Sequence, residues 1–193
     1  MLNRQVQSKF NLLLIAVEVF FSMNWLKRLL LVLPVLGLWG CPRYTEVPET
    51  SYTPVLMERS VLETAIRWMP PRPLGVPAKI YWLPPYLLIS EQYKGVHIFN
   101  NSDPANPEAI GFVRVDGCVD MAVVNGLLAV DNAVDLVLLD LTSQPGTVIV
   151  KNRQREVFPE LTPPDNGRMP FPFQKANRPP NTVVVAWEKG AGS

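Results

Sequence analysis

The sequence predicts a mainly β protein with two antiparallel four-stranded, propeller-like blades, a short N-terminal helix and a signal segment. Two observations predict this class. Between residues 78 and 152 short apolar runs alternate with turn residues, and the series of runs occurs twice. Before this region, an apolar segment that follows two basic residues ends at a cysteine, as in an export signal.

The strands of the two predicted blades are marked by apolar runs between turn residues. The first series covers 79–83, 86–90, 95–100 and 109–115, and the second covers 119–125, 127–131, 134–141 and 147–152. Pro84-Pro85 and Asn125-Gly126 are typical turn residues. Alternation along the runs predicts the following buried residues: Ile80, Leu88, Ile89, Val96, Ile98, Phe112, Val123, Leu128, Leu136 and Leu138.

The two series align as a repeat. Leu87-Leu88 matches Leu127-Leu128, and the run 96–100 matches 136–140, at an offset of about 40 residues. That offset is the length of a four-stranded propeller blade. The alternative is a pair of unrelated hairpins in one small sandwich, which would share turn spacing without sharing residue types at matched positions.

The segment 23–40 is predicted to be a lipoprotein signal peptide. Lys27 and Arg28 form its positive flank, and residues 29–40 form an apolar core that is shorter than the roughly 20 residues of a membrane span. The sequence Leu-Trp-Gly-Cys at 38–41 resembles a lipobox, so Cys41 is the predicted site of lipidation. Residues 1–22 are then an upstream extension before a start at Met23. A membrane hairpin made of the two apolar segments is the alternative.

The remaining segments flank the repeat region. Residues 41–54 are predicted to be a tether, and 55–77 a short helix followed by a proline-rich linker. The helical face would carry Leu56, Val61, Leu62, Ile66 and Met69, with Ser60 as cap and Glu63 three residues on. Residues 153–193 are predicted to be a proline-rich tail with one strand at 181–188.

The stretch YKGVHIFNNSDPANPEAIGFVRVDGCVDMAVVNGLLAVDNAVDLVLLDLTS, residues 93–143, resembles the LVIVD-repeat proteins, which are propeller-like bacterial lipoproteins. The matching positions are Gly95, Val96, His97, Ile98, Ser102, Asp103, Pro104, Asn106, Pro107, Gly117, Val119 and Asp120. The resemblance extends over roughly residues 52–187. Members of the family usually continue through further blades, so the resemblance implies a partial or truncated repeat array.

The inventory of reactive side chains is small. His97 is the single histidine, and its place between Val96 and Ile98 predicts a half-exposed strand residue rather than a catalytic base. No G-x-S-x-G, G-x-x-x-x-G-K or G-x-G-x-x-G pattern occurs, and zinc ligands are too few. Cys118 is predicted to be buried in an apolar strand, with a disulfide to Cys41 as the alternative.

Acidic residues gather in the second half of the repeat region. They lie at strand ends or turns: Asp116, Asp120, Asp131, Asp135 and Asp140. Carboxylates at one rim of a sheet could hold calcium, and the first four are the candidates for such a site. The preferred interpretation is that these aspartates close turns and accept backbone N–H groups, because no D-x-D-x-D-G spacing is present.

These observations favour a binding or scaffold module over an enzyme. The chain has a formal net charge of +1 and no basic stripe, so nucleic acid is not an expected partner. The expected partners are membrane lipid, through acylated Cys41, and a protein or glycan at a bacterial cell envelope, with the outer membrane as location. No cofactor is expected. The alternative is a fragment of a larger propeller with a metal-dependent or hydrolytic site on its loops.

Overall fold

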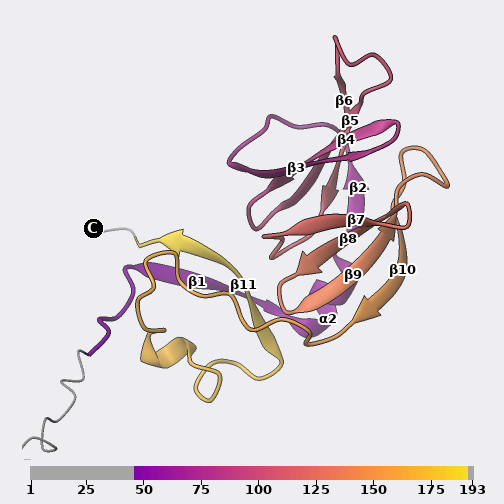
Figure 1. The fold of residues 1–193 in the computed structure, drawn as a ribbon. Helices are drawn as coiled ribbons and strands as arrows, with labels where there is room; N and C mark the ends of the chain where they lie inside the picture. The colour runs from indigo at the N-terminus through magenta and orange to yellow at the C-terminus, as the bar shows by residue number, and fades with distance from the viewer. Residues whose placement is uncertain (1–45, 191–193) are drawn as a thin grey trace, which may run out of the picture. The chain divides into compact units, whose positions relative to one another are not determined.

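Residues 46–190 are described by the computed structural model, and they form a mainly β fold with several antiparallel sheets, none closed (Figure 1). The elements are β1 (Tyr52–Glu58), α2 (Arg59–Thr64), β2 (Arg67–Met69), β3 (Pro77–Leu83), β4 (Tyr86–Glu91), β5 (Gly95–Asn100), β6 (Glu108–Arg114), β7 (Met121–Val124), β8 (Leu127–Asn132), β9 (Asp135–Asp140), β10 (Ile149–Gln154), the 3-10 turn η1 (Phe171–Phe173) and β11 (Thr182–Lys189).

Sheet 1 has the strand order β2-β6-β5-β4-β3. Its strands β3 to β6 form an antiparallel meander, as predicted for the first blade, and β2 adds a fifth strand that was not predicted. The entry into β5 requires Gly95, whose φ is +138°. A Cβ atom at this position would lie 2.1 Å from the carbonyl oxygen of Val113, so glycine lets β5 pair closely with β6.

Sheet 2 has the strand order β10-β9-β8-β7 and is the second antiparallel meander. Asn125 and Gly126 connect β7 and β8 with φ values of 50° and 76°. Positive φ at both central residues is the requirement of a two-residue hairpin whose twist matches that of its strands. The predicted Asn-Gly turn is confirmed, and the second unit has the four predicted strands.

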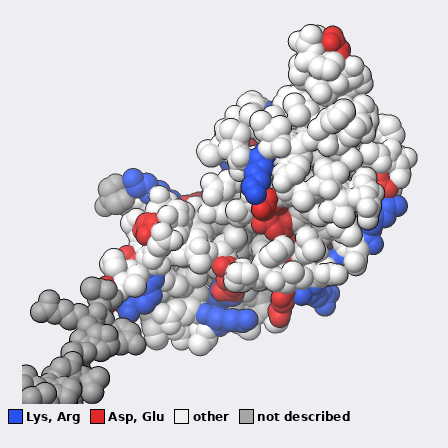
Figure 2. Space-filling view, viewed as in Figure 1, with Lys and Arg blue, Asp and Glu red and all other residues white. Residues whose placement is uncertain are grey.

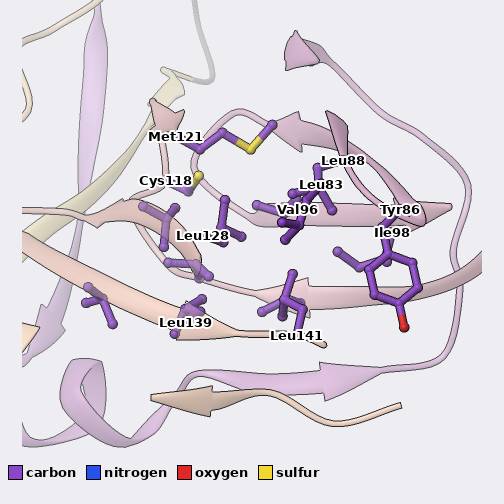
Figure 3. Close-up of a cluster of buried hydrophobic side chains, with 14 residues drawn as sticks. Leu83, Tyr86, Leu88, Val96, Ile98, Cys118, Met121, Leu128, Leu139 and Leu141 are labelled. Atoms are coloured by element: carbon purple, nitrogen blue, oxygen red, sulfur yellow. The ribbon is translucent and has the colours of Figure 1, made fainter. Parts of the chain in front are cut away.

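The main hydrophobic core lies between the inner faces of the two sheets. Leu88, Val96 and Ile98 of sheet 1 belong to one buried cluster with Leu128 and Leu139 of sheet 2, and Figure 3 shows these side chains directed into a shared interior. Burying several such aliphatic side chains contributes roughly 1.5–3 kcal/mol for each one. The packing of the two meanders against each other therefore stabilises both.

The predicted core residues have mixed outcomes. Leu88, Val96, Ile98, Phe112 and Leu128 are buried, as predicted. The predicted burial is wrong for Ile80, which is 65% exposed, because its side chain lies on the outer face of an edge strand. Four further residues are half-buried: Ile89, Val123, Leu136 and Leu138.

The alternation in β9 was predicted in the wrong phase. Val137 and Leu139 are fully buried, whereas Leu136 and Leu138 point to the other face. The strand pairs explain the error, since Leu88 pairs with Ile98 in sheet 1 and its counterpart Leu128 pairs with Leu139 in sheet 2. The chain between the paired residues Leu128 and Leu139 of the β8–β9 hairpin is one residue longer than the chain between Leu88 and Ile98 of the β4–β5 hairpin. A shift of one residue exchanges the two faces of a strand. The prediction applied the same offset of about 40 residues to the whole repeat, so it assigned the side chains of β9 to the wrong face.

The predicted helix within 55–69 is wrong in extent. Residues 52–58 form β1 and 67–69 form β2, so that α2 has only the six residues Arg59–Thr64. Ser60 lies inside this helix, the N-cap position is Glu58, and no side chain caps it. Strand pairing overrode the helical periodicity, because β1 pairs along its whole length with β11. Leu62 is buried, while Val61 is exposed.

The strands β1 and β11 form a separate two-stranded sheet (Figure 1). The strand predicted at 181–188 is confirmed as β11. A second buried cluster joins Leu62 of α2 and Val183 of β11 to Ala133 and Val134, which form the turn between β8 and β9. The tail is also bound to the start of the described chain, because Asp165 accepts hydrogen bonds from Thr50 and Ser51.

The predicted export signal and Cys41 lie outside the described residues, as do all predictions for 1–45. Within residues 46–190 the structure has no helix long and apolar enough to cross a membrane.

Candidate functional site

The candidate aspartates Asp120 and Asp131 lie close together at the start of sheet 2. Asp131 Oδ1 accepts the backbone N–H groups of Val119, at 2.8 Å, and of Asp120, at 2.9 Å. Asp120 forms an ion pair with Lys79 of β3, with 2.7 Å between Nζ and Oδ1. The hydrogen bond from Lys79 lowers the pKa of Asp120, whereas burial raises the pKa of Asp131 despite its backbone hydrogen bonds.

Asp135 is the most deeply buried of these carboxylates, with an exposed fraction of 0%. Arg59 of α2 donates to both of its oxygens at 2.7 and 2.8 Å, and Arg153 of β10 donates at 2.6 Å. The backbone N–H of Glu156 adds a bond of 3.1 Å. Asp135 thus connects α2, the start of β9 and the end of β10, and its position and partners fit a structural role.

Asp140 and Asp116 are bound by residues close to each of them in the chain. Asp140 accepts the N–H groups of Thr142 and Ser143 and the hydroxyl of Ser143, and these bonds hold its pKa well below the ordinary range. Asp116 forms an ion pair with Arg114 at 2.9 Å. The aspartates of this group are therefore held by separate sets of partners, and Asp131 and Asp140 accept backbone N–H groups at turns. In the part of the chain that the structure describes, no three acidic, histidine or cysteine side chains are grouped to hold a metal ion.

His97 is buried, so the prediction of a half-exposed residue is wrong. Its exposed fraction is 3%, and its Nε2 lies 2.8 Å from Oε2 of Glu91, which is 1% exposed. The His97 ring also makes an edge contact with Phe112, with 4.8 Å between the ring centroids. The His97 side chain lies on the outer face of sheet 1, where a covering segment excludes water.

The covering segment is the proline-rich linker 70–76. Arg72 reaches Glu91 Oε1 at 3.2 Å, and its guanidinium lies over the ring of Phe112, 4.8 Å from the centroid. Lys94 reaches the same oxygen at 3.0 Å. Burial acts to raise the pKa of Glu91, but the hydrogen bonds from His97 and Lys94 and the charge of Arg72 outweigh it, so the pKa is lowered.

Glu91 is a site residue that the sequence analysis missed. Its main partners are brought to it by β-pairing and by the linker, and Arg72 lies 19 residues away in the chain. Gly75 lets the linker approach, because a Cβ atom there would lie 2.5 Å from Glu91 Oε1. An acidic residue at a strand end gave no signal of burial.

Cys118 is buried with a free thiol, as the preferred prediction states, but it lies between β6 and β7 rather than in a strand. Burial raises the pKa of this thiol well above its ordinary value. A thiol that is protonated and buried is a poor nucleophile and metal ligand. Cys118 is part of the core between the two sheets.

Two cavities of the described part of the chain are large enough to hold a small molecule. The first has about 650 Å³ and is lined by Arg59, Val134, Arg155, Glu156, Phe158, Pro159, Glu160, Lys175, Arg178, Pro179, Pro180, Asn181, Thr182 and Val183. The second, called the sheet 2 cavity, has about 520 Å³ and lies against the outer face of sheet 2. It is lined by Tyr81, Val119, Asp120, Met121, Ala122, Ala129, Asp131, Ala133, Leu136, Phe158, Pro159, Glu160, Leu161 and Thr162.

The outer face of sheet 1 exposes large apolar side chains beyond the part that the linker covers. Ile80 pairs with Ile89, Trp82 with Leu87, and Leu87 with Phe99, so these five residues share one face. Ile80 and Trp82 are each 65% exposed. In the view of Figure 2 few charged groups interrupt the surface over β3 to β6. We call these five residues the apolar patch of sheet 1.

Comparisons of the chain with protein-family models, with curated proteins and with solved structures found no match.

Proposed function

We propose that this chain is a lipid-anchored lipoprotein of a bacterial envelope, at the outer membrane, and that it acts as a binding or scaffold module built from LVIVD-type propeller repeats, without catalysis. The anchor would be acylated Cys41. The observation that carries the binding role is the apolar patch of sheet 1, with Ile80 and Trp82 each 65% exposed. Exposed apolar patches of this kind mark interaction surfaces.

The chemistry of the patch fits a second copy of the chain. The inner face of sheet 1 already packs on sheet 2 through aliphatic residues on paired strands, and the outer face offers the same residue types on the same strands. A two-fold axis would bring the apolar patches of two copies together, so that each Trp82 covers the apolar surface of its partner. Such a contact is self-complementary, as in most homodimers.

The expected interface is small. The patch lies on β3, β4 and β5. Three strands about 4.8 Å apart and about 20 Å long give a face on the order of 300 Å² for each copy, which belongs to the weak or transient class. Anchoring both copies to one membrane surface raises their effective concentration. A lipid anchor and a weak apolar interface therefore support the same function, which is assembly at the membrane.

Sedimentation velocity of the full chain in density-matched detergent tests self-association. We expect a reversible dimer in the micromolar range, and Trp82→Glu should weaken it by about tenfold or more because the charge must be desolvated in an apolar interface. Val61→Glu is the matched control, since Val61 is 48% exposed on α2, outside the patch. A wild-type chain that stays monomeric, or equal effects of the two variants, would refute the dimer.

Intact mass of the membrane fraction tests the anchor. We expect a species that begins at Cys41 and carries acyl chains, and Cys41→Ala should retain residues 23–40. A wild-type product with an unmodified Cys41 thiol would contradict the proposed localisation.

A second candidate is a portion of a larger propeller with a metal-dependent or hydrolytic site on its loops. The same apolar patch supports it, because a neighbouring blade would cover this face in a ring. Calcium titration with thermal unfolding separates the two candidates. A midpoint that rises with micromolar calcium, and no longer rises in Asp120→Asn, would favour the second candidate.

A further inference from the structure

The sheet 2 cavity has a floor of small side chains. Ala122 of β7 pairs with Ala129 of β8, and both lie on the outer face of sheet 2. Leu136 of β9 lies beside them, because it pairs with Asp131 on the same face. Alanines leave open the space that longer side chains would fill, so the cavity has a volume of about 520 Å³. Cavities of this size are typical of small-molecule sites.

The segment 158–162 forms the opposite wall of this cavity and is held by the fold. The N–H of Phe158 donates to the carbonyl of Val134 at 3.0 Å. The indole N–H of Trp187 donates to the carbonyl of Leu161 at 3.1 Å. Glu160 is bound by Arg178, which also donates to the carbonyl of Thr182. The wall is therefore fixed to β11 and to the turn before β9.

The charged residues that line the cavity are all acidic. Asp120 is paired with Lys79, and Glu160 is paired with Arg178. Asp131 differs, because within residues 46–190 no basic side chain lies at salt-bridge distance from it, and its hydrogen bonds from Val119 and Asp120 reach Oδ1. Burial raises the pKa of this carboxyl, and the nearby charge of Asp120 acts in the same direction.

We propose that the sheet 2 cavity binds a small organic cation, with its apolar body against Ala122, Ala129 and Leu136 and its primary ammonium group paired with the carboxylate of Asp131. Apolar walls supply the surface that the body buries, and Asp131 supplies the charge-assisted hydrogen bond that fixes its orientation. The site is independent of the apolar patch of sheet 1 and of the lipid anchor.

The test uses the full chain in lipid nanodiscs and three probes of one shape: cyclohexylammonium, cyclohexanol and cyclohexanecarboxylate. Backbone amide shifts of Ala122 and Ala129 report on occupancy of the cavity. We expect cyclohexylammonium to bind about tenfold or more tightly than cyclohexanol, and cyclohexanecarboxylate to bind least. Equal binding of the cation and the alcohol would overturn the proposal.

Two variants test separately how the charge of Asp131 and the free volume of the cavity contribute to binding. Asp131→Asn keeps an oxygen acceptor for the two backbone N–H groups but removes the charge, so cyclohexylammonium should bind only as weakly as cyclohexanol. Ala129→Leu fills the floor, so it should abolish binding of both. Asp103→Asn is the matched control, because Asp103 is an exposed carboxylate on the loop before β6. A preference for the cation that survives Asp131→Asn, or binding that survives Ala129→Leu in a folded variant, would refute the site.

Discussion

Sheet 1 and sheet 2 share an antiparallel four-stranded meander, but their outer faces are covered differently. Sheet 1 is covered at one end by the linker 70–76 and exposes Ile80 and Trp82 beyond it. Sheet 2 carries Ala122 and Ala129 at its outer face, and the segment 158–162 lies across them with a cavity between. The strand pattern therefore builds the core, while the covering segments decide which surface is available for binding.

The two sheets also bury their carboxylates differently. Glu91 of sheet 1 is held by His97 from the neighbouring strand and by Arg72 and Lys94 from segments beside it. Asp135 of sheet 2 is held by two arginines from α2 and β10. The first cluster fastens a covering loop, whereas the second fastens a helix and an edge strand.

The largest expected effect is at Asp135. Asp135→Ala leaves Arg59 and Arg153 without their shared carboxylate, and breaking a buried ion pair in this way costs about 3–5 kcal/mol of unfolding free energy. Urea unfolding of the full chain measures it. Glu108→Ala is the control, because Glu108 is exposed, and we expect it to change stability by no more than about 0.5 kcal/mol. A loss under about 1 kcal/mol for Asp135→Ala would contradict the structural role of this carboxylate.

The second largest loss of stability is expected for the buried face of β9. Leu139→Ala should lower the free energy of unfolding by about 2–5 kcal/mol, because this side chain is fully buried between the sheets. Leu138→Ala is the matched neighbour and should cost clearly less, since Leu138 is half-buried on the other face. Denaturant unfolding of both variants compares them. Equal losses would mean that β9 has both faces in the core.

Glu91 gives a smaller, pH-dependent effect. Its pKa is lowered in the folded chain, so its stabilising contribution is complete above the ordinary glutamate pKa of about 4.3 and is lost as the pH falls through the lower folded value. Glu91→Gln should cost about 1–3 kcal/mol at neutral pH, and the difference from wild type should shrink below about pH 4. Unfolding curves across this range measure it. A difference that grows on acidification would contradict the assignment.

The smallest effect is expected at the apolar patch of sheet 1. Ile80→Lys should change the stability of the monomer by no more than about 0.5 kcal/mol, because the side chain is 65% exposed. Thermal unfolding at low protein concentration measures it. A large loss would show that the outer face of sheet 1 is packed within one chain, which would remove the difference between the two sheets.

The sequence by itself predicted much of the strand order and turn chemistry. The Asn125-Gly126 hairpin, the strand near 181–188 and the burial of Leu88, Val96 and Ile98 follow from local patterns, because side-chain alternation and positive φ act over a few residues. Local patterns gave the wrong secondary structure where pairing with a distant strand determines it. Residues 55–58 were predicted to begin a helix, and pairing with β11 makes them part of the strand β1.

Only the tertiary structure decided which groups meet. One additional residue in the β8–β9 hairpin placed Val137 and Leu139, rather than Leu136 and Leu138, in the core. The linker 70–76 carries Arg72 to Glu91 and covers His97, and residues 158–162 of the tail form one wall of the cavity over Ala129 and Asp131. Contacts between residues far apart in sequence leave no local periodicity, so local sequence patterns determined the strands and turns of the two meanders, while packing determined β1, β2 and the candidate sites.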